Sequence, residues 1–516
     1  MDSSPGACKH PCVQSKAIKS VVIVGGGTAG WMTAASLAHR LQRLGVSITL
    51  VESSAVGTIG VGEATVPAIR RYFQSLGLDA FEVMKATNGT IKLAIEFEGW
   101  KHEGHSFMHP FGRYGLEAGP VEFHDLWNRL RTQGNGGTLD EYSMGVQLSR
   151  AHRVTMPPEK PRVDFEEFDW AVHFDAGRFA AFLRSFAEAR GVKRIDARVA
   201  EVLRDGESEK LRAIRLDSGE TLEGSLFIDC SGFHRLLIEK SLHAGFVDWR
   251  HWLMCDRAIA LPCAHKDANE IAPYTRSRAL EAGWTWRIPL QNRVGNGYVY
   301  SSDHIGDDQA LSVLRSQLEG EVLGEPNLVR FRAGHVRRFW IGNCVAIGLS
   351  AGFLEPLEST SISLIQMGID KLLHFWPDEA ISPELVDEYN RLSITEYERI
   401  RDFIVLHYSA NGRKDGELWR YCREMPLPET LTRKIALYRA RGLIRQFDSE
   451  SFFEQSWLCM YGNFGIDAAS WSPLTNLLPM KDLEEVTRRV REDIARIAQG
   501  ATPHREFLRQ AGALAS

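Results

Sequence analysis

Residues 21–30 have the sequence VVIVGGGTAG, and this stretch decides the fold class of the 516-residue chain. The β-branched run 21–24 is typical of a buried strand. A glycine-rich turn follows it, and an apolar helical pattern then covers Trp31 to about Leu44. Residues 47–51 form a second β-branched run. The order of strand, glycine turn, helix and strand predicts the first unit of a Rossmann-like domain.

The glycines of this stretch have the GxGxxG spacing of a dinucleotide-binding loop. Gly25 allows the tight turn, Gly27 lets the backbone approach a pyrophosphate, and Gly30 lets helix and strand pack closely. The positive end of the helix then faces the phosphates, and Glu52 after the second strand is placed to bind ribose hydroxyls. A glycine turn without a ligand is the alternative. The cofactor contacts expected here are Gly25, Gly27, Thr28, Ala29, Gly30 and Glu52.

Composition excludes several classes of protein. Hydrophobic residues make up 44% and charged residues 25%, which are ordinary values for a globular protein. Lys plus Arg is 61 and Asp plus Glu is 66, so the net charge of −5 argues against a nucleic-acid partner. No apolar run reaches the ~18 residues that a membrane span requires.

The cysteines indicate neither a disulfide scaffold nor a metal site. Eight are scattered over the chain, and the one close group, Cys8, His10 and Cys12, fits no zinc-site spacing. We predict no bound metal, no signal peptide and a reducing cytoplasm as the location.

Two more short strands precede glycine-containing loops farther along the chain, at 226–229 and 344–347. The nucleotide-binding domain is therefore expected to be discontinuous. Between these strands, 283–290 is expected to be a strand, 294–297 a hairpin turn and 298–300 the returning strand of a substrate region.

The last third of the chain is expected to be helical. The helical pattern begins at about Ser363, and apolar residues keep a spacing of three to four from Leu483 to Ile497, which predicts an amphipathic helix packed on the body of the protein. The expected organisation is a flexible tail at 1–17, a discontinuous cofactor-binding module at 18–370 and a mainly helical substrate-side region at 371–516.

Two later loops favour FAD over NAD as the cofactor. Residues 229–233 resemble the second dinucleotide motif of flavin monooxygenases, and residues 348–353 occupy the place where those enzymes close over the flavin. No second GxGxxG occurs, so we expect no NAD(P)H site of that kind, and reduced flavin must come from elsewhere. Arg178 is either a phosphate ligand or a solvated helix charge. The further expected flavin contacts are Ala64, Arg178, Asp229, Gly348 and Leu349.

Four separated motifs, spread over about residues 20–470, resemble the flavin-dependent halogenases. Residues 283–289, GWTWRIP, match the WxWxIP motif of that family. Residues 60–67 with 88–95, and residues 353–361, resemble its tryptophan halogenase branch. The resemblance implies an α/β fold with a Rossmann-like FAD-binding domain of the flavin monooxygenase type, a mixed β-sheet substrate region and a helical C-terminal region.

The resemblance also implies a mechanism. Reduced FAD, O2 and a halide yield hypohalous acid, which passes through a tunnel to Lys92, where it is held by a hydrogen bond or as an N-haloamine beside the aromatic substrate. Glu358 is expected to place and polarise the electrophile, and it is a candidate acceptor for the leaving proton. Read without the motifs, Lys92 is a snorkelling lysine and Glu358 an acid at a helix N-terminus. The protonation state of Lys92 stays open, because burial and a nearby carboxylate act in opposite directions.

The halide and the substrate are assigned to residues in the same way. The halide is expected at the backbone N–H groups of Thr360 and Ser361, where many tryptophan halogenases have glycine in place of the serine; chloride and bromide both stay open. His109, Phe111 and Trp457 are expected to flank the aromatic ring, with a buried histidine network as the alternative for His109. Paired tyrosines that hold the amino-acid end of tryptophan are not evident, which favours indole or another electron-rich ring.

The sequence therefore predicts a FADH2-dependent halogenase of a small aromatic substrate. An FAD-dependent aromatic hydroxylase and a non-catalytic flavin-binding protein are the alternatives. The expected partner is a separate NADH-dependent flavin reductase that supplies FADH2 by diffusion, and the oligomeric state is left open, a dimer being the alternative to a monomer.

Overall fold

The computed structural model describes residues 16–55, 62–206, 208–267 and 269–515. Most of the predicted tail, with Cys8, His10 and Cys12, lies outside the described residues, as do Gly60 and Val61 of the 60–67 motif.

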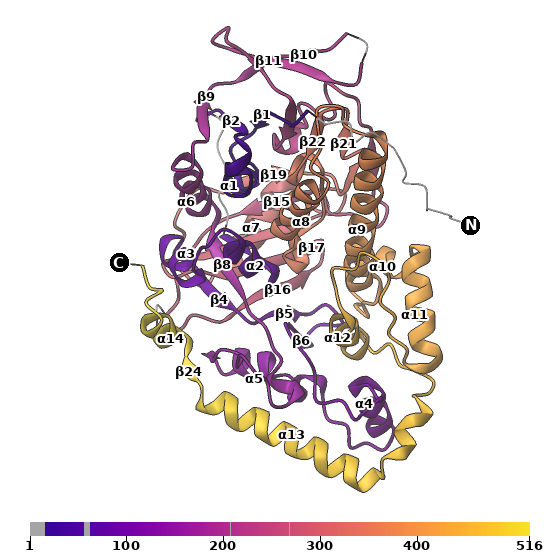
Figure 1. The fold of residues 1–516 in the computed structure, drawn as a ribbon. Coiled ribbons are helices and arrows are strands. Elements are labelled where there is room, and N and C mark those ends of the chain that lie inside the picture. The colour runs from indigo at the N-terminus through magenta and orange to yellow at the C-terminus, as the bar shows by residue number, and fades with distance from the viewer. Residues whose placement is uncertain (1–15, 56–61, 207, 268, 516) are drawn as a thin grey trace, which may run out of the picture.

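A six-stranded sheet forms the cofactor-side part of the molecule, shown at the top of Figure 1. Its strand order is β21-β22-β13-β1-β2-β9, and all neighbours are parallel except β21 and β22. Segments from three distant parts of the chain build this sheet, as the sequence predicts. The strands are β1 (Ser20–Val24), β2 (Ser47–Glu52), β9 (Lys193–Asp196), β13 (Leu226–Asp229), β21 (Trp340–Ile341) and β22 (Cys344–Ala346).

The first helix, α1 (Thr28–Leu41), begins three residues before its predicted start at Trp31. The α-helix itself ends at Leu41, and a 3-10 turn, Gln42–Leu44, continues the helical segment to the predicted end, where Gly45 with φ +64° terminates it. The helix therefore begins inside the glycine loop, and the N–H groups of its first turn are left without partners within the helix. Helix α6 (Ala176–Glu188) packs beside α1.

A seven-stranded, mostly antiparallel sheet forms the centre of the molecule, in the order β19-β15-β18-β17-β16-β5-β6. The predicted turn at 294–297 is wrong, because these residues lie within β18, and the chain turns instead at Leu290–Arg293. Gly297 is a packing residue: a Cβ there would lie 2.1 Å from the Trp286 ring. The strands are β5 (Ala94–Glu98), β6 (Ser106–Pro110), β15 (Arg257–Ala260), β16 (Tyr274–Leu280), β17 (Gly283–Pro289), β18 (Val294–Tyr300) and β19 (Asn327–Arg330).

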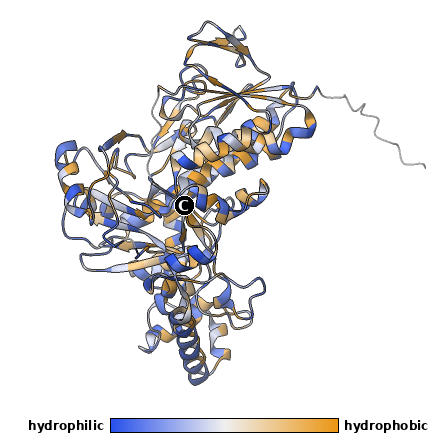
Figure 2. Ribbon diagram, turned by 90° about the vertical axis from the view of Figure 1, so that its left-hand side faces the viewer, coloured by the Kyte–Doolittle hydropathy of each residue, from blue (hydrophilic) through white to orange (hydrophobic). Residues whose placement is uncertain are grey.

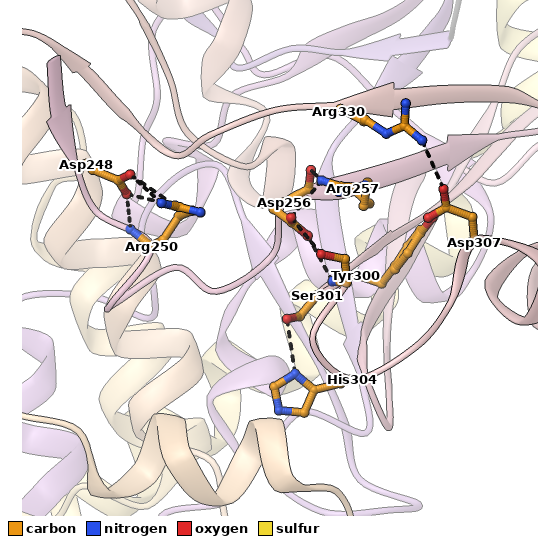
Figure 3. Close-up of polar contacts among 10 residues, drawn as sticks. Asp248, Arg250, Asp256, Arg257, Tyr300, Ser301, His304, Asp307 and Arg330 are labelled. Atoms are coloured by element: carbon orange, nitrogen blue, oxygen red, sulfur yellow. Dashed lines mark hydrogen bonds and ion pairs between the residues drawn. The ribbon is translucent and has the colours of Figure 1, made fainter.

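A polar network joins this sheet to α7 (Asp307–Gln317), and Figure 3 shows its side chains. The Tyr300 hydroxyl donates to Asp307 Oδ1 at 2.7 Å, and Arg330 approaches the other oxygen of the same carboxylate at 3.4 Å. Arg257 donates to Asp256 Oδ2 at 2.7 Å. The two ion pairs, Arg330 with Asp307 and Arg257 with Asp256, are partly exposed, so each contributes at most about 1 kcal/mol.

A small antiparallel sheet, β3-β8-β4, lies against the seven-stranded sheet through β3 and β4. Lys92 ends β4 and pairs with Ala171 of β8. The turn before β4 is tight, because Asn88 has φ +52° and a Cβ on Gly89 would lie 2.8 Å from the carbonyl oxygen of His173. The strands are β3 (Gly62–Ala64), β4 (Thr90–Lys92) and β8 (Ala171–Asp175).

Helices dominate from residue 360 onward, close to the predicted start at about Ser363. They are α8 (Thr360–His374), α9 (Pro383–Ser409), α10 (Glu417–Glu424), α11 (Glu429–Arg441), α12 (Glu454–Phe464), α13 (Met480–Gly500) and α14 (His504–Gln510). The predicted amphipathic helix is α13, which runs along the bottom of Figure 1 and is largely hydrophilic in Figure 2. It buries Leu483, Val490 and Ile494 against the body, as expected, whereas Val486 of the same apolar pattern is exposed.

One hydrophobic core extends from Ile18 to Ala513, so the helices share it with the sheets. No helix in the described part of the chain is both long and apolar enough to cross a membrane. The remaining helices are α2 (Ala68–Ser75), α3 (Ala80–Ala86), α4 (Phe123–Thr132) and α5 (Met144–Arg150). The remaining strands are β7 (Arg153–Val154), β10 (Val199–Arg204), β11 (Leu211–Leu216), β12 (Thr221–Glu223), β14 (Phe246–Asp248), β20 (Gly334–Val336), β23 (Gly352–Phe353) and β24 (Thr502–Pro503).

Candidate active site

Lys92 is completely buried and holds its amine in a defined place. Its Nζ donates to the carbonyl oxygen of Thr65 at 2.9 Å and to Ser359 Oγ at 2.8 Å. The ring of Phe111 lies beside the amine, with 5.2 Å between Nζ and the ring centroid. Burial lowers the pKa of Lys92 from 10.5 to about 7, against an opposing effect of the Glu358 charge. Both the ammonium and the free amine are therefore accessible near neutral pH.

Glu358 is also buried, and two histidines hold it. His109 Nδ1 lies 2.9 Å from Oε2, and His407 Nε2 lies 2.8 Å from Oε1. Burial by itself raises the pKa of Glu358, but the charges and hydrogen bonds of the two histidines outweigh burial and lower that pKa to about 2. The carboxylate is therefore ionised and fixed in orientation. The second ring nitrogen of His407 faces the carbonyl oxygen of Phe403 at 2.7 Å, which fixes the ring.

The segment after Glu358 connects the carboxylate to the amine. Residues 356–358 form one 3-10 turn, and Ser359 then has φ +59° before α8 starts at Thr360. This left-handed conformation turns the Ser359 hydroxyl toward Lys92. No side chain caps the start of α8, and the buried Thr360 Oγ1 has no hydrogen-bond partner among the described residues. Thr360 and Ser361 thus offer backbone N–H groups, and Thr360 a hydroxyl, at the positive end of a 15-residue helix.

The glycine loop leaves room for a phosphate group where the sequence predicts one. A Cβ on Gly25 would lie 2.2 Å from the carbonyl oxygen of Cys230, and one on Gly30 would lie 1.8 Å from the carbonyl oxygen of Gly25. At Gly27 a Cβ would meet no atom of the described residues within 4 Å, so its backbone is open on that side. Gly27 is also the N-cap of α1, and no side chain in the described part of the chain satisfies the N–H groups there. Thr28 and Ala29 form the first turn of that helix. These residues fit a dinucleotide pyrophosphate.

Glu52 has a partner that the sequence did not predict. Its Oε1 accepts a hydrogen bond from Arg194 Nε at 2.5 Å, and Arg194 also pairs with Asp196 at 3.0 Å. The carboxyl group lies directly over Gly26, because a Cβ there would overlap Oε2. One oxygen of Glu52 is thus held by Arg194, and the other faces the glycine loop.

The other expected flavin contacts lie in different surroundings. The buried carboxylate of Asp229 accepts hydrogen bonds from Ser231 and from the backbone of Leu237 and Ile238, so it shapes its own loop. Gly348 lies against the first loop, since its Cβ would be 2.6 Å from Ala29 Cβ, and Leu349 follows it, partly exposed. Ala64 is buried in β3. The Arg178 side chain is exposed at the start of α6, where Asp175 caps the helix.

An aromatic group lies on the α9 and α12 side of His109. The rings of Phe403 and Phe452 stack with 3.9 Å between centroids, and Trp457 lies edge-on to Phe403 at 5.1 Å. The His109 ring is 5.8 Å from that of Phe403. Trp457 is buried and donates through Nε1 to Glu450 Oε2 and to the carbonyl oxygen of Phe452, both at 3.2 Å.

The structure therefore brings Lys92, Glu358, His109 and Phe111 into one connected group. The sequence analysis missed His407, whose signal was a single histidine within the apolar helical run FIVLHY at 403–408. It also missed Thr65 and Ser359, which had been quoted only as parts of motifs.

Known proteins resemble this chain in sequence over most of its length. A family model described as tryptophan halogenase matches residues 20–480. The chain is 39% identical over 444 residues to a tryptophan 6-halogenase, ThaL, from Streptomyces albogriseolus, with 82% of each chain covered. It is 33% identical to the tryptophan 7-halogenase RebH from Lentzea aerocolonigenes, covering 96% of this chain and 98% of that protein.

A solved structure agrees with these matches. BrvH, a flavin-dependent halogenase from Brevundimonas sp. BAL3, superposes with a TM-score of 0.93 at 46% identity, and the match covers 96% of this chain and 99% of that one.

Proposed function

The chain belongs to the tryptophan halogenase family and is a flavin-dependent halogenase of aromatic substrates, and from this premise we propose that Lys92 and Glu358 deliver an electrophilic halogen to an indole-like ring. The observation that carries the proposal is the connected group of a buried amine, Ser359 and a histidine-held carboxylate. The family membership favours this activity over an aromatic hydroxylase or a non-catalytic flavin-binding protein.

FAD would bind along the loop of Gly25 to Gly30, with Glu52 Oε2 directed at the ribose and Gly348 closing the site. When bound and reduced, the flavin supplies the activation of O2 that oxidises a halide ion to hypohalous acid. We place the halide at the N–H groups of Thr360 and Ser361, because they lie at an uncapped helix start and Thr360 adds an unpartnered hydroxyl. Arg178 is exposed, so we assign it no more than a long-range charge effect.

Lys92 holds the electrophile in the proposed reaction. As a free amine it has two N–H bonds, which match the two acceptors Thr65 and Ser359, so its lone pair is free for an electrophilic halogen. As an ammonium it donates its third hydrogen to the oxygen of hypohalous acid. The pKa of about 7 allows either form at neutral pH.

Glu358 stabilises the positive charge that develops on the ring when the halogen is transferred. Two histidines fix the carboxylate before the reaction, so little reorganisation accompanies the charge change. The ring then loses a proton to restore aromaticity, and Glu358 or solvent accepts it. The low pKa of Glu358 keeps it ionised at neutral pH, which suits the role of a charge partner.

An indole-like substrate fits the surroundings better than free tryptophan. His109, Phe111 and Trp457 provide ring contacts, while the buried cation nearest Trp457, Lys434, is already paired with Glu450 at 2.6 Å. A substrate carboxylate would have to break that pair. We therefore propose indole or a substituted indole, attacked at its most electron-rich carbon.

We also propose a partner and a location for the enzyme. A separate NADH-dependent reductase supplies the reduced flavin by diffusion. All six cysteines in the described part of the chain are free and buried, which is compatible with a reducing cytoplasm.

The test combines the purified chain with FAD, a flavin reductase, NADH, O2 and bromide or chloride, and analyses indole for halogenated product by mass spectrometry. We expect product with the natural chain and none with Lys92→Ala, although FAD binding, measured by flavin fluorescence, is retained. Equal product formation by Lys92→Ala would refute the role of Lys92.

A further inference from the structure

Glu355 is a second buried carboxyl group, three residues before Glu358. Its side chain is fully buried. Trp284 Nε1 donates to its Oε2 at 2.9 Å, and the Tyr408 hydroxyl donates to the same oxygen at 2.5 Å. The other oxygen, Oε1, has no hydrogen-bond partner among the described residues. A buried carboxyl group held through one oxygen by two neutral donors is costly, so its presence calls for a reason.

The two donors come from elements that matter for the site. Trp284 is the first tryptophan of the WTWRIP stretch in β17, and Tyr408 follows His407 directly in α9. Consecutive residues of one helix therefore hold two carboxyl groups, Tyr408 holding Glu355 and His407 holding Glu358.

Aromatic packing keeps these groups from moving independently. The Trp100 ring lies 6.3 Å from that of Trp284, 5.4 Å from that of Tyr408 and 6.2 Å from that of His407, measured between centroids. Trp100 is itself fully buried and donates to the carbonyl oxygen of Ser277 at 3.2 Å. Trp100 therefore packs between β17 and α9 and contacts rings that hold both carboxyl groups.

We propose that Glu355 is a positioning residue, which anchors segment 355–361 to Trp284 and Tyr408 so that Glu358 and Ser359 keep their places around Lys92. This inference rests on the proposed function and deepens it. The segment needs an anchor, because Ser359 holds a left-handed conformation that is unfavourable for a non-glycine residue. Without the anchor the segment relaxes, and Ser359 Oγ leaves the amine.

The hydrogen bond to Glu355 gives Trp284, the first tryptophan of the WTWRIP stretch, a specific role in this proposal. Trp284 acts through its indole N–H on Glu355, whereas the Trp286 ring packs over Gly297 of the neighbouring strand. Both donors bind the same oxygen of residue 355, Oε2. The amide oxygen of glutamine can therefore replace this acceptor, and an aliphatic side chain cannot.

The experiment compares Trp284→Phe, Glu355→Leu and Glu355→Gln with the natural chain, and uses Trp286→Phe as a matched control that leaves both donors to Glu355 in place. Each protein is given FAD, reductase, NADH, O2, bromide and indole, together with a small 1,3-diketone that traps free hypobromous acid. The readout is the partition of bromine between indole and the diketone, with kcat and KM for indole. Flavin affinity and the melting temperature are measured alongside.

We expect Trp284→Phe and Glu355→Leu to shift the partition toward the diketone by on the order of tenfold or more, because small displacements of catalytic groups have large effects on rate. The loss should be in kcat, with KM and flavin affinity retained. Glu355→Gln and Trp286→Phe should keep the partition of the natural chain.

Two results would overturn the inference. One is an unchanged partition in Trp284→Phe, and the other is a Glu355→Gln protein that behaves like Glu355→Leu, which would mean that the charge and not the acceptor oxygen matters. If Glu355→Leu does not fold, the other two variants still decide the question. Absence of brominated indole with the natural chain, by contrast, would contradict the proposed function and not the role of Glu355 alone.

Discussion

Replacing Lys92 with methionine should stabilise the protein, and the gain should depend on pH. The pKa of Lys92 falls from 10.5 in its ordinary state to about 7 in the folded protein, mainly through burial. The shift is about 3.5 pH units, and each unit corresponds to about 1.36 kcal/mol, so the folded state is destabilised by about 5 kcal/mol when both states are protonated. Methionine has a similar shape and no proton to bind.

The direction of the pH effect follows from proton binding. The unfolded amine binds its proton more tightly than the folded one, so the destabilisation is complete below pH ~7 and disappears as the pH rises toward the unfolded pKa. Between about pH 6 and about pH 9 the penalty decreases by about 2.5 kcal/mol. The difference in free energy of unfolding between Lys92→Met and the natural chain should shrink by that amount. The cost of the two lost hydrogen bonds is taken as the same at both pH values, so it does not change this difference between them.

Urea unfolding of both proteins at these two pH values measures the effect. Lys85→Met serves as the control, since Lys85 is exposed on α3 and its replacement should give no comparable pH dependence. In a Glu358→Gln background the pKa of Lys92 should fall further, because the carboxylate raises it, and the transition should move to lower pH. A stability difference between Lys92→Met and the natural chain that is the same at both pH values would refute the assignment of a depressed pKa.

Three further outcomes are expected. His407→Leu removes a hydrogen bond to a buried carboxylate, worth about 1.5–3 kcal/mol, so the halogenation rate should fall by about tenfold or more. The pKa of Glu358 should rise, with activity lost first at low pH, and an unchanged pH–rate profile would argue against this role. The purified chain should oxidise NADH poorly and gain turnover when a reductase is added, even across a dialysis membrane that passes only flavin; rapid NADH oxidation by the chain alone would contradict the idea. Indole should be halogenated at C3 faster than free tryptophan at any position, as initial rates and product NMR can establish, and efficient benzo-ring halogenation of tryptophan would reveal a clamp for its amino-acid end.

Local patterns were sufficient to predict the framework of the fold. The run 21–24, the glycine spacing after it and the strand at 47–51 each depend on neighbours in sequence, and the structure confirms them as β1, the loop before α1 and β2. The periodicity of 483–497 likewise predicted α13. The hairpin turn was misplaced because glycine has two uses: Gly295 and Gly297 suggested a turn, but they are small residues that allow close packing against Gly62 and Trp286.

The site was harder to predict, because its side-chain partners are distant in sequence. The contact between Glu358 and His407 spans 49 residues, and that between Glu355 and Trp284 spans 71. No local sequence pattern predicts such pairs. Lys92 and Glu358 were identified only through a family resemblance, which names residues but not the contacts that fix the pKa of each.

The support of Lys92 from the far end of the chain has a consequence for the timing of synthesis. The N–H of Ile91, the residue before Lys92, donates to His504 Nε2 at 3.1 Å, and His504 Nδ1 lies 2.9 Å from the carbonyl oxygen of Ile271. His504 is buried at the start of α14, so it is a structural neighbour of β4 although more than 400 residues separate them. On the ribosome, the strand that carries the amine cannot acquire this partner until residue 504 has left the exit tunnel. A nascent chain would therefore complete its six-stranded sheet well before β4 gains this support, and the surroundings of Lys92 would be completed late.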